Sequence, residues 1–167
     1  MTQVLELDPN RPQKDLIEFA ATIIRHGGLV AFPTETVYGL GADALNENAV
    51  LKIYEAKGRP PDNPCIVHVN GLEMLDLVAV RVGPAEDLIQ KFWPGPLTLV
   101  LERKPEVAPS VSAGLHTVAV RMPSAQIALE LIKVAGTPIA APSANASGRP
   151  SPTSATHVLE DLRGRID

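Results

Sequence analysis

Short apolar runs alternate with amphipathic stretches along the whole chain. The apolar runs are bounded by glycine, proline or polar residues, which is the pattern of buried strands. The expected strands cover residues 4–7, 29–32, 65–69, 97–102, 117–121 and 138–142.

Apolar residues recur at helical spacing between these runs. Side-chain oxygens that can cap a helix N-terminus come from Asn46 or Asn48, from Ser124, and from Thr153 or Ser154. The expected helices cover residues 14–26, 46–56, 72–79, 85–92, 124–134 and 153–164, whereas the WPGP segment at 93–96 is incompatible with regular structure.

Strands that alternate with helices indicate a layered α/β domain with an open sheet. The connection from 92 to 97 is too short for a crossover between parallel strands, so we expect a mixed sheet. With 167 residues, no repeat and no low-complexity linker, the chain is expected to form one domain. Ligands of such sheets bind at strand ends.

Composition and charge narrow the class of protein. The chain is 45% hydrophobic and 20% charged, as is typical of globular proteins. A net charge of −4 argues against a protein that coats nucleic acid by bulk electrostatics. The single cysteine, Cys65, excludes an internal disulfide and a multi-cysteine zinc site. Neither a signal peptide nor a membrane-spanning run is evident, so we expect a cytoplasmic protein without a membrane partner.

Polar side chains gather near the ends of several expected strands. Hydroxyls and cations at such positions suit a ligand that carries carboxylate or phosphate groups. The four clusters are 34–41, with hydroxyls, one carboxylate and two glycines; 57–64, the KGRPPDNP segment; Arg121 at the end of TVAVR; and 141–153, rich in serine and threonine.

Each cluster also has a plainer interpretation. The first is a capped turn whose strand continues through VYGL, and Lys57 with Arg59 complements a helix dipole. Arg121 can form a surface ion pair, and His68 is a core histidine satisfied by backbone. Only 141–153 has more hydroxyls than turns and caps need, which favours ligand contact.

Three familiar motifs are absent or misleading. GLGADA fits the dinucleotide pattern, but six residues separate it from LVAF and its acidic candidate, Glu55, falls on an expected helix. We therefore expect its glycines to shape a turn. Ser143 lacks the G-x-S-x-G context of a hydrolase nucleophile, and no P-loop is present.

The four clusters together resemble the YrdC/Sua5 family of L-threonylcarbamoyladenylate synthases. The resemblance rests on PTETVYGLG, KGR at 57–59, IVHV at 66–69 and SAN at 143–145, and extends from about residue 27 to residue 164. It implies a twisted, open, mixed sheet with flanking helices, a YrdC/RibB-like fold, around a large basic cavity.

The resemblance also implies a reaction. L-threonine, bicarbonate and ATP are joined into threonylcarbamoyl-AMP with release of pyrophosphate, for the t6A modification of tRNA. The implied partners are these substrates, the t6A transferase machinery and tRNA. Mg²⁺ is expected to arrive with ATP, since the sequence has no dedicated carboxylate cluster for a metal.

Site residues follow from the same resemblance, position by position. It assigns L-threonine binding to Thr36, His68, Arg121 and Ala141. It assigns ATP binding to Arg59, Asn63, Thr117, Ser143 and Ser151, and catalysis to Lys57, Arg59, Ser143 and Asn145.

Family members continue past the position of Asp167 with a glycine turn, a Ser-Thr segment and further ATP contacts. We therefore expect the domain at 1–167 to lack its C-terminal end. Two alternatives remain open: a non-catalytic RNA-binding module, and the carbamoyl-transfer module of a larger maturation protein.

Overall fold

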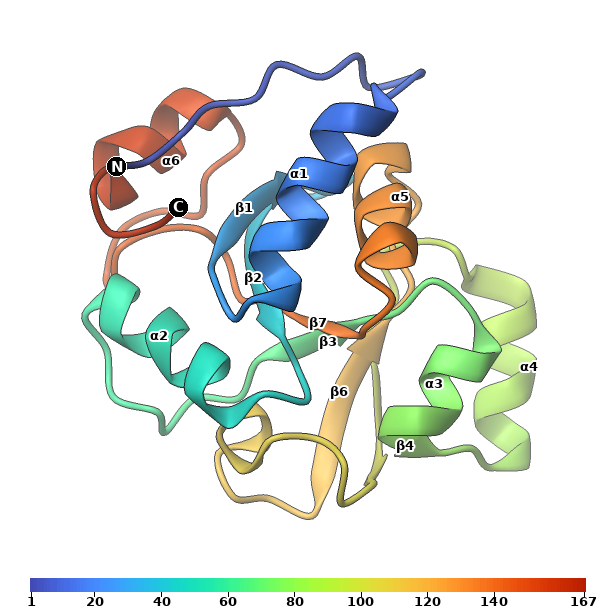
Figure 1. Ribbon diagram of the computed structural model, residues 1–167. Helices are drawn as coiled ribbons and strands as arrows, with labels where there is room; N and C mark the ends of the chain where they lie inside the picture. Colours follow the sequence, from blue (N-terminus) through green and yellow to red (C-terminus); the bar gives the residue numbers. More distant parts are fainter.

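One mixed sheet of seven strands organises the chain (Figure 1). The computed structural model describes residues 1–167. The strand order is β1-β2-β7-β3-β6-β5-β4, and only the β3–β6 pair is parallel. The strands are β1 Val30–Pro33, β2 Tyr38–Asp43, β3 Ile66–His68, β4 Ala79–Val80, β5 Leu99–Arg103, β6 Thr117–Arg121 and β7 Ile139–Ala140.

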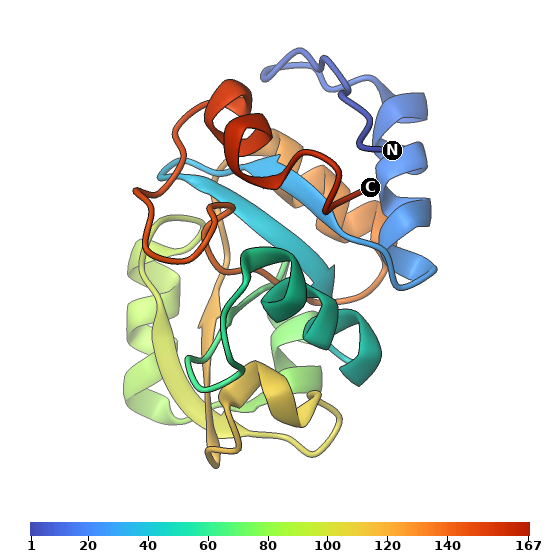
Figure 2. The ribbon, with the colours of Figure 1, turned by 90° about the vertical axis from the view of Figure 1, so that its left-hand side faces the viewer.

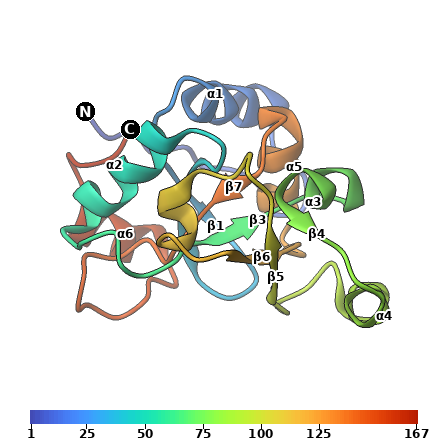
Figure 3. The ribbon, with the colours of Figure 1, turned by 90° about the horizontal axis from the view of Figure 1, so that it is seen from below.

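Six helices and one 3₁₀ turn surround the sheet. Helices α1 and α5 lie side by side against β1 and β2, whereas α3 and α4 lie beside β4 and β5 at the opposite end (Figures 1 and 3). The helices are α1 Lys14–Arg25, α2 Glu47–Lys57, α3 Leu72–Val78, α4 Gly83–Phe92, α5 Gln126–Ala135 and α6 Ala155–Leu162, and the 3₁₀ turn η1 is Pro109–Ser112.

Local capping explains where the helices next to the candidate site begin and end. The Asn46 side chain accepts a hydrogen bond from the Ala49 N–H at the start of α2. Gly58 ends this helix with a φ of 65°, in the left-handed region that favours glycine. Ser154 caps α6 through the His157 N–H, so the expected caps of these two helices are confirmed.

The two ends of the chain lie next to each other (Figure 2). The Thr2 hydroxyl donates to the Ile166 carbonyl at 2.7 Å, and its oxygen accepts the Gly164 N–H at 2.8 Å. Residues 4–7 do not form the expected strand and pair with no other strand. Their apolar side chains instead cover an apolar cavity next to α1 and α6, which explains the strand-like alternation.

Strand β2 corrects the interpretation of GLGADA. The segment is the body of this strand rather than a turn, so the alternative of a strand through VYGL is confirmed. A Cβ on Gly41 would lie 2.7 Å from the Phe32 ring and 2.8 Å from Ile139. The glycines therefore make room for an aromatic ring against the sheet, rather than shaping the expected turn.

Three smaller differences concern element boundaries. Helix α5 begins at Gln126 after Ala125, without the Ser124 side-chain cap expected from the sequence. The short strand β4 and the turn η1 were not expected. The remaining helices and strands coincide with the expected ranges to within a few residues, and the expected α/β class with a mixed sheet is confirmed.

Candidate active site

Arg121 is the centre of a buried polar cluster at the ends of β3 and β6. The parallel register places it beside His68, the last residue of β3. Its side chain is only 8% exposed. Nη1 donates to Thr36 Oγ1 at 3.1 Å, and Nη2 lies 2.8 Å from Glu35 Oε1, an ion pair whose angle is not that of an aligned hydrogen bond.

The turn between β1 and β2 presents Glu35 and Thr36 to this guanidinium. Thr34 Oγ1 donates to the Val37 carbonyl at 2.7 Å and accepts the Thr36 N–H at 3.2 Å. Since the Thr34 hydrogen is committed to Val37, the Thr36 hydroxyl donates to Thr34 Oγ1, 3.0 Å away, and turns its lone pairs to Arg121. The turn is therefore preformed.

Glu35 remains ionised in this position. Burial alone would raise its pKa, but the charged Arg121 guanidinium and hydrogen bonds from the backbone of Glu35 and Ser124 outweigh burial and hold the pKa below its usual value. Ser124 thus contributes its backbone here rather than a helix cap. Glu35 was not among the predicted site residues, although it is the single acid in the turn after a buried strand.

His68 is a neutral, buried member of the cluster. Burial lowers its pKa to about 4, and the positive charge of Arg121 acts in the same direction. Nδ1 donates to the Ile66 carbonyl at 3.1 Å, which leaves Nε2 as the acceptor of the ring. The ring stands edge-on to Phe32, with centroids 6.0 Å apart.

Lys57 joins the end of α2 to the loop after β7. Its side chain is buried, and Nζ donates to the Ser143 and Asn145 carbonyls, each at 2.6 Å. Burial lowers the pKa of Lys57 to about 8, and Arg59 adds to this effect, so the ammonium is still charged at neutral pH. The Ser147 N–H returns a bond to the Lys57 carbonyl at 2.9 Å.

The loop from 141 to 152 is fixed along its length. The Ala141 N–H donates to the Ile66 carbonyl at 2.9 Å, and Ser143 forms a bridge with Gly39. Asn145 is buried and donates Nδ2 to the carbonyls of Ala146 and Arg149, at 3.0 and 2.8 Å. This connects the Lys57 end of the site to β2.

Arg59 and Asn63 lie together beyond α2. Arg59 Nη2 donates to the Asn63 carbonyl at 2.9 Å, and the guanidinium carbon lies 5.2 Å from the Tyr54 ring centroid. The Tyr54 hydroxyl donates to the Ser110 carbonyl at 2.8 Å and lies 3.3 Å from Cys65 Sγ. Tyr54, one helical turn before Lys57, therefore supports Arg59 and was not singled out from the sequence.

The predicted residues divide between the two ends of the β3–β6 pair. His68 and Arg121 end these strands, with Thr36 bonded to Arg121. Thr117 begins β6, about 13 Å from Arg121 at about 3.3 Å per residue, on the side where Asn63 precedes β3. Ser151 is exposed and has no recorded side-chain partner. The assignment of each residue to threonine or ATP stays a prediction.

Unpaired buried polar atoms occur only in predicted site residues. They are Arg59 Nε, Arg121 Nε, Arg121 Nη2 and Asn145 Oδ1. Native structures pair nearly all buried polar groups, so each exception requires an explanation. A polar ligand or ordered water can complete these bonds at both ends of the site.

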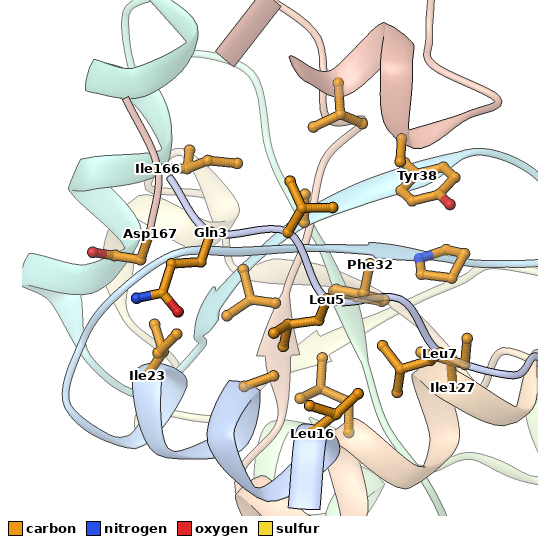
Figure 4. A pocket seen from close by; sticks show the side chains of 18 of the residues that line it. Gln3, Leu5, Leu7, Leu16, Ile23, Phe32, Tyr38, Ile127, Ile166 and Asp167 are labelled. Atoms are coloured by element: carbon orange, nitrogen blue, oxygen red, sulfur yellow. The ribbon is translucent and has the colours of Figure 1, made fainter. Parts of the chain in front are cut away.

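An apolar cavity lies elsewhere in the chain. It has a volume of about 180 Å³ and lies among α1, α5, α6 and the N-terminal segment (Figure 4). Its lining is mostly aliphatic, with Gln3, Tyr38 and Asp167 among the few polar residues. It has no cation for a phosphate, so it is not the candidate active site, and the large basic cavity stays a prediction.

Two further findings concern metals and membranes. No three His, Cys, Asp or Glu side chains are grouped as they would be around a metal ion. None of the helices combines the length and the apolar character that crossing a bilayer requires.

The family model Sua5/YciO/YrdC, described as telomere recombination, matches residues 22–167. The chain belongs to the Sua5/YciO/YrdC family. A threonylcarbamoyl-AMP synthase of Pyrococcus abyssi is 60% identical over 152 residues, which are 90% of this chain and 45% of that protein. The expected YrdC/Sua5 membership is thus confirmed.

Solved structures of this family share the fold. The crystal structure of P. abyssi Sua5 complexed with L-threonine has a TM-score of 0.92 at 58% identity, over 94% of this chain and 46% of that one. Full-length HypF in its phosphate- and nucleotide-bound form has a TM-score of 0.78 at 25% identity, over 90% and 23%. The chain spans about half the length of several curated relatives that it matches.

Replacing Lys57 by methionine keeps an apolar stem and removes the ammonium. The Ser143 and Asn145 carbonyls then lose their donor, so we expect the free energy of unfolding in urea to fall by about 3 kcal/mol. The control is Lys52→Met on the same helix. Lys52 is exposed and donates to one carbonyl, that of Gly27, so a loss of at most about 1 kcal/mol is expected. Equal losses would show that Lys57 does not anchor the loop.

His68 makes stability depend on pH. The pKa of His68 is about 4 in the folded protein and about 6.5 when unfolded, so the unfolded chain binds the proton first as pH falls. Stability is therefore lost between pH 6.5 and 4, by about 3 kcal/mol from this group. The free energy of unfolding in urea is measured at several pH values between 6.5 and 4 for His68→Gln and for the unchanged protein. The free energy that His68→Gln loses on acidification should be smaller by about 3 kcal/mol. Parallel curves for the two proteins would contradict a neutral His68.

Proposed function

We propose that this chain forms L-threonylcarbamoyl-AMP and pyrophosphate from L-threonine, bicarbonate and ATP. The observation that carries the proposal is the set of unpaired buried polar atoms on Arg121, Arg59 and Asn145, at the two ends of one strand pair. A relative 60% identical is named threonylcarbamoyl-AMP synthase, and a structure 58% identical contains L-threonine.

L-threonine is assigned to the Arg121 end of the site. A guanidinium binds a carboxylate as a fork, and the Nε and Nη2 atoms of Arg121 are the pair without aligned acceptors. Neutral His68 offers Nε2 as an acceptor for the substrate hydroxyl, and Thr36 holds the guanidinium in place. Ala141 supplies backbone beside β3.

ATP is assigned to the Lys57 end. Arg59 Nε is a buried donor, and the charges of Arg59 and Lys57 favour a triphosphate. Lys57 already donates to two carbonyls, so its main part in this proposal is to shape the loop that carries Ser143 and Asn145. Asn63, Thr117 and Ser151 are the further expected contacts.

The reaction needs no protein nucleophile. The threonine ammonium first releases a proton to solvent; the free amine then attacks the bicarbonate carbon, its second proton leaves with the hydroxyl as water, and a carbamate forms. A carbamate oxygen then attacks the α-phosphorus, the bond to the bridging oxygen breaks, and pyrophosphate departs with its electron pair. The protein holds the reactants together, and Arg59 stabilises the charge that builds on the phosphates. Mg²⁺ enters on the phosphates of ATP as part of the substrate.

Two other functions are less well supported. An RNA-binding module would need a basic surface and stacking aromatics, but the net charge is −4 and aromatics are 4% of residues. For the carbamoyl-transfer alternative, the resemblance to HypF is weaker, at 25% identity against 60% for the synthase. Delivery of the product to a t6A transferase and tRNA in the cytoplasm is the wider role we propose.

Pyrophosphate release tests the proposal directly. We expect release from ATP that requires both L-threonine and bicarbonate, and that Arg59→Ala lowers at least about tenfold, because a buried donor to the phosphates is lost. Release without threonine would favour carbamoyl transfer. The proposal would be contradicted if neither this chain nor a chain continued past Asp167 released pyrophosphate when all three substrates are present.

A further inference from the structure

The donors of Arg121 are unequally satisfied. Nη1 donates to Thr36 Oγ1, whereas Nε and Nη2 have no aligned acceptor. These two nitrogens form the side-on edge of the guanidinium, which matches the two oxygens of a carboxylate. Glu35 Oε1 already lies 2.8 Å from Nη2 as an ion-pair partner, so its negative charge stands next to the edge that a bound carboxylate would use.

A second carboxylate at this edge cannot simply be added. Two carboxylates beside one guanidinium repel each other, so Glu35 must either leave Nη2 or gain a cation of its own. An α-amino acid brings that cation, because its ammonium group is on the carbon next to its carboxylate. A hydroxy acid of the same size does not.

The Glu35 side chain is able to change partner. It is 20% exposed, compared with 8% for Arg121, and it projects from a turn rather than from a strand. The backbone of the turn is fixed by Thr34, and Thr36 keeps Nη1 in place. Rotation of the Glu35 side chain therefore releases Nη2 without moving the guanidinium, at the cost of the backbone hydrogen bonds that Glu35 and Ser124 give to the carboxylate.

We propose that Glu35 selects α-amino acids over hydroxy acids. In the free protein Glu35 neutralises Arg121, and on binding it accepts hydrogen bonds from the substrate ammonium while Arg121 takes the substrate carboxylate. The inference rests on the proposed function, because it takes L-threonine as the ligand of the Arg121 edge. It makes Glu35 a specificity-determining residue.

The ligand pair that tests this role is L-threonine and 2,3-dihydroxybutanoate, in which a hydroxyl replaces the ammonium. Both are titrated by calorimetry into the unchanged chain and into Glu35→Gln, which keeps the shape and removes the charge. We expect Glu35→Gln to weaken L-threonine at least about tenfold, the loss of one charge-assisted hydrogen bond. Binding of the dihydroxy acid should stay the same or strengthen, because the repulsion disappears.

Two other variants control for folding and for charge. Asp76 lies on α3, away from the site, and its carboxylate binds Arg81. Asp76→Asn removes this carboxylate and should change the affinity for neither L-threonine nor the dihydroxy acid. Glu35→Asp keeps the charge and should keep the preference for the ammonium ligand.

Three results would decide against the inference or against its premise. If a folded Glu35→Gln weakened the binding of both ligands equally, selection by Glu35 would be overturned. Tighter binding of both ligands would overturn it too, because Glu35 would then only compete with the ligand carboxylate for Arg121. An unchanged chain that binds no L-threonine would instead overturn the proposed function.

Discussion

The burial of one positive charge at the end of β6 constrains the rest of the candidate site. Removing a guanidinium from water costs several kcal/mol unless acceptors replace the water. Arg121 finds them in Glu35 and Thr36, which belong to the turn between β1 and β2. Two strands, β7 and β3, separate β2 from β6 in the sheet, so the turn must reach across them. The ion pair therefore joins both halves of the sheet at the place where a ligand carboxylate is expected.

A second anchor of different chemistry lies at the other end of the site. Lys57 is bound by two carbonyls of the loop after β7, and the same loop bonds to β2 through the Tyr38 and Leu40 backbone. The Lys57 bonds are made to fixed backbone carbonyls, whereas the Glu35 carboxylate is on a side chain that can exchange one cation for another. The candidate site thus combines a fixed frame at the Lys57 end with one exchangeable contact at the Arg121 end.

Periodicity and capping were sufficient to predict most of the fold, including β6 at its observed bounds and both caps that were found. They failed where packing between distant residues decides the structure. Strand β2 contains glycines that suggest a turn until Phe32 is seen against Gly41, and residues 4–7 alternate like a strand but pack on helices. The end of the TVAVR strand located Arg121 and the KGR motif located Lys57. Their partners, Glu35 and two loop carbonyls, depend on three-dimensional contacts that no spacing in the sequence encodes.

The Nε–H of Arg121 reports most directly on whether the buried guanidinium binds an amino-acid carboxylate. Its signal in a side-chain proton–nitrogen NMR spectrum can be assigned by its absence from Arg121→Lys. Titration with L-threonine should shift this signal downfield until it saturates, because an unpaired donor gains a carboxylate oxygen. L-threoninamide, which lacks the carboxylate, should leave it in place. An Nε–H signal that L-threonine does not move, or that both compounds move equally, would contradict a carboxylate site on Arg121.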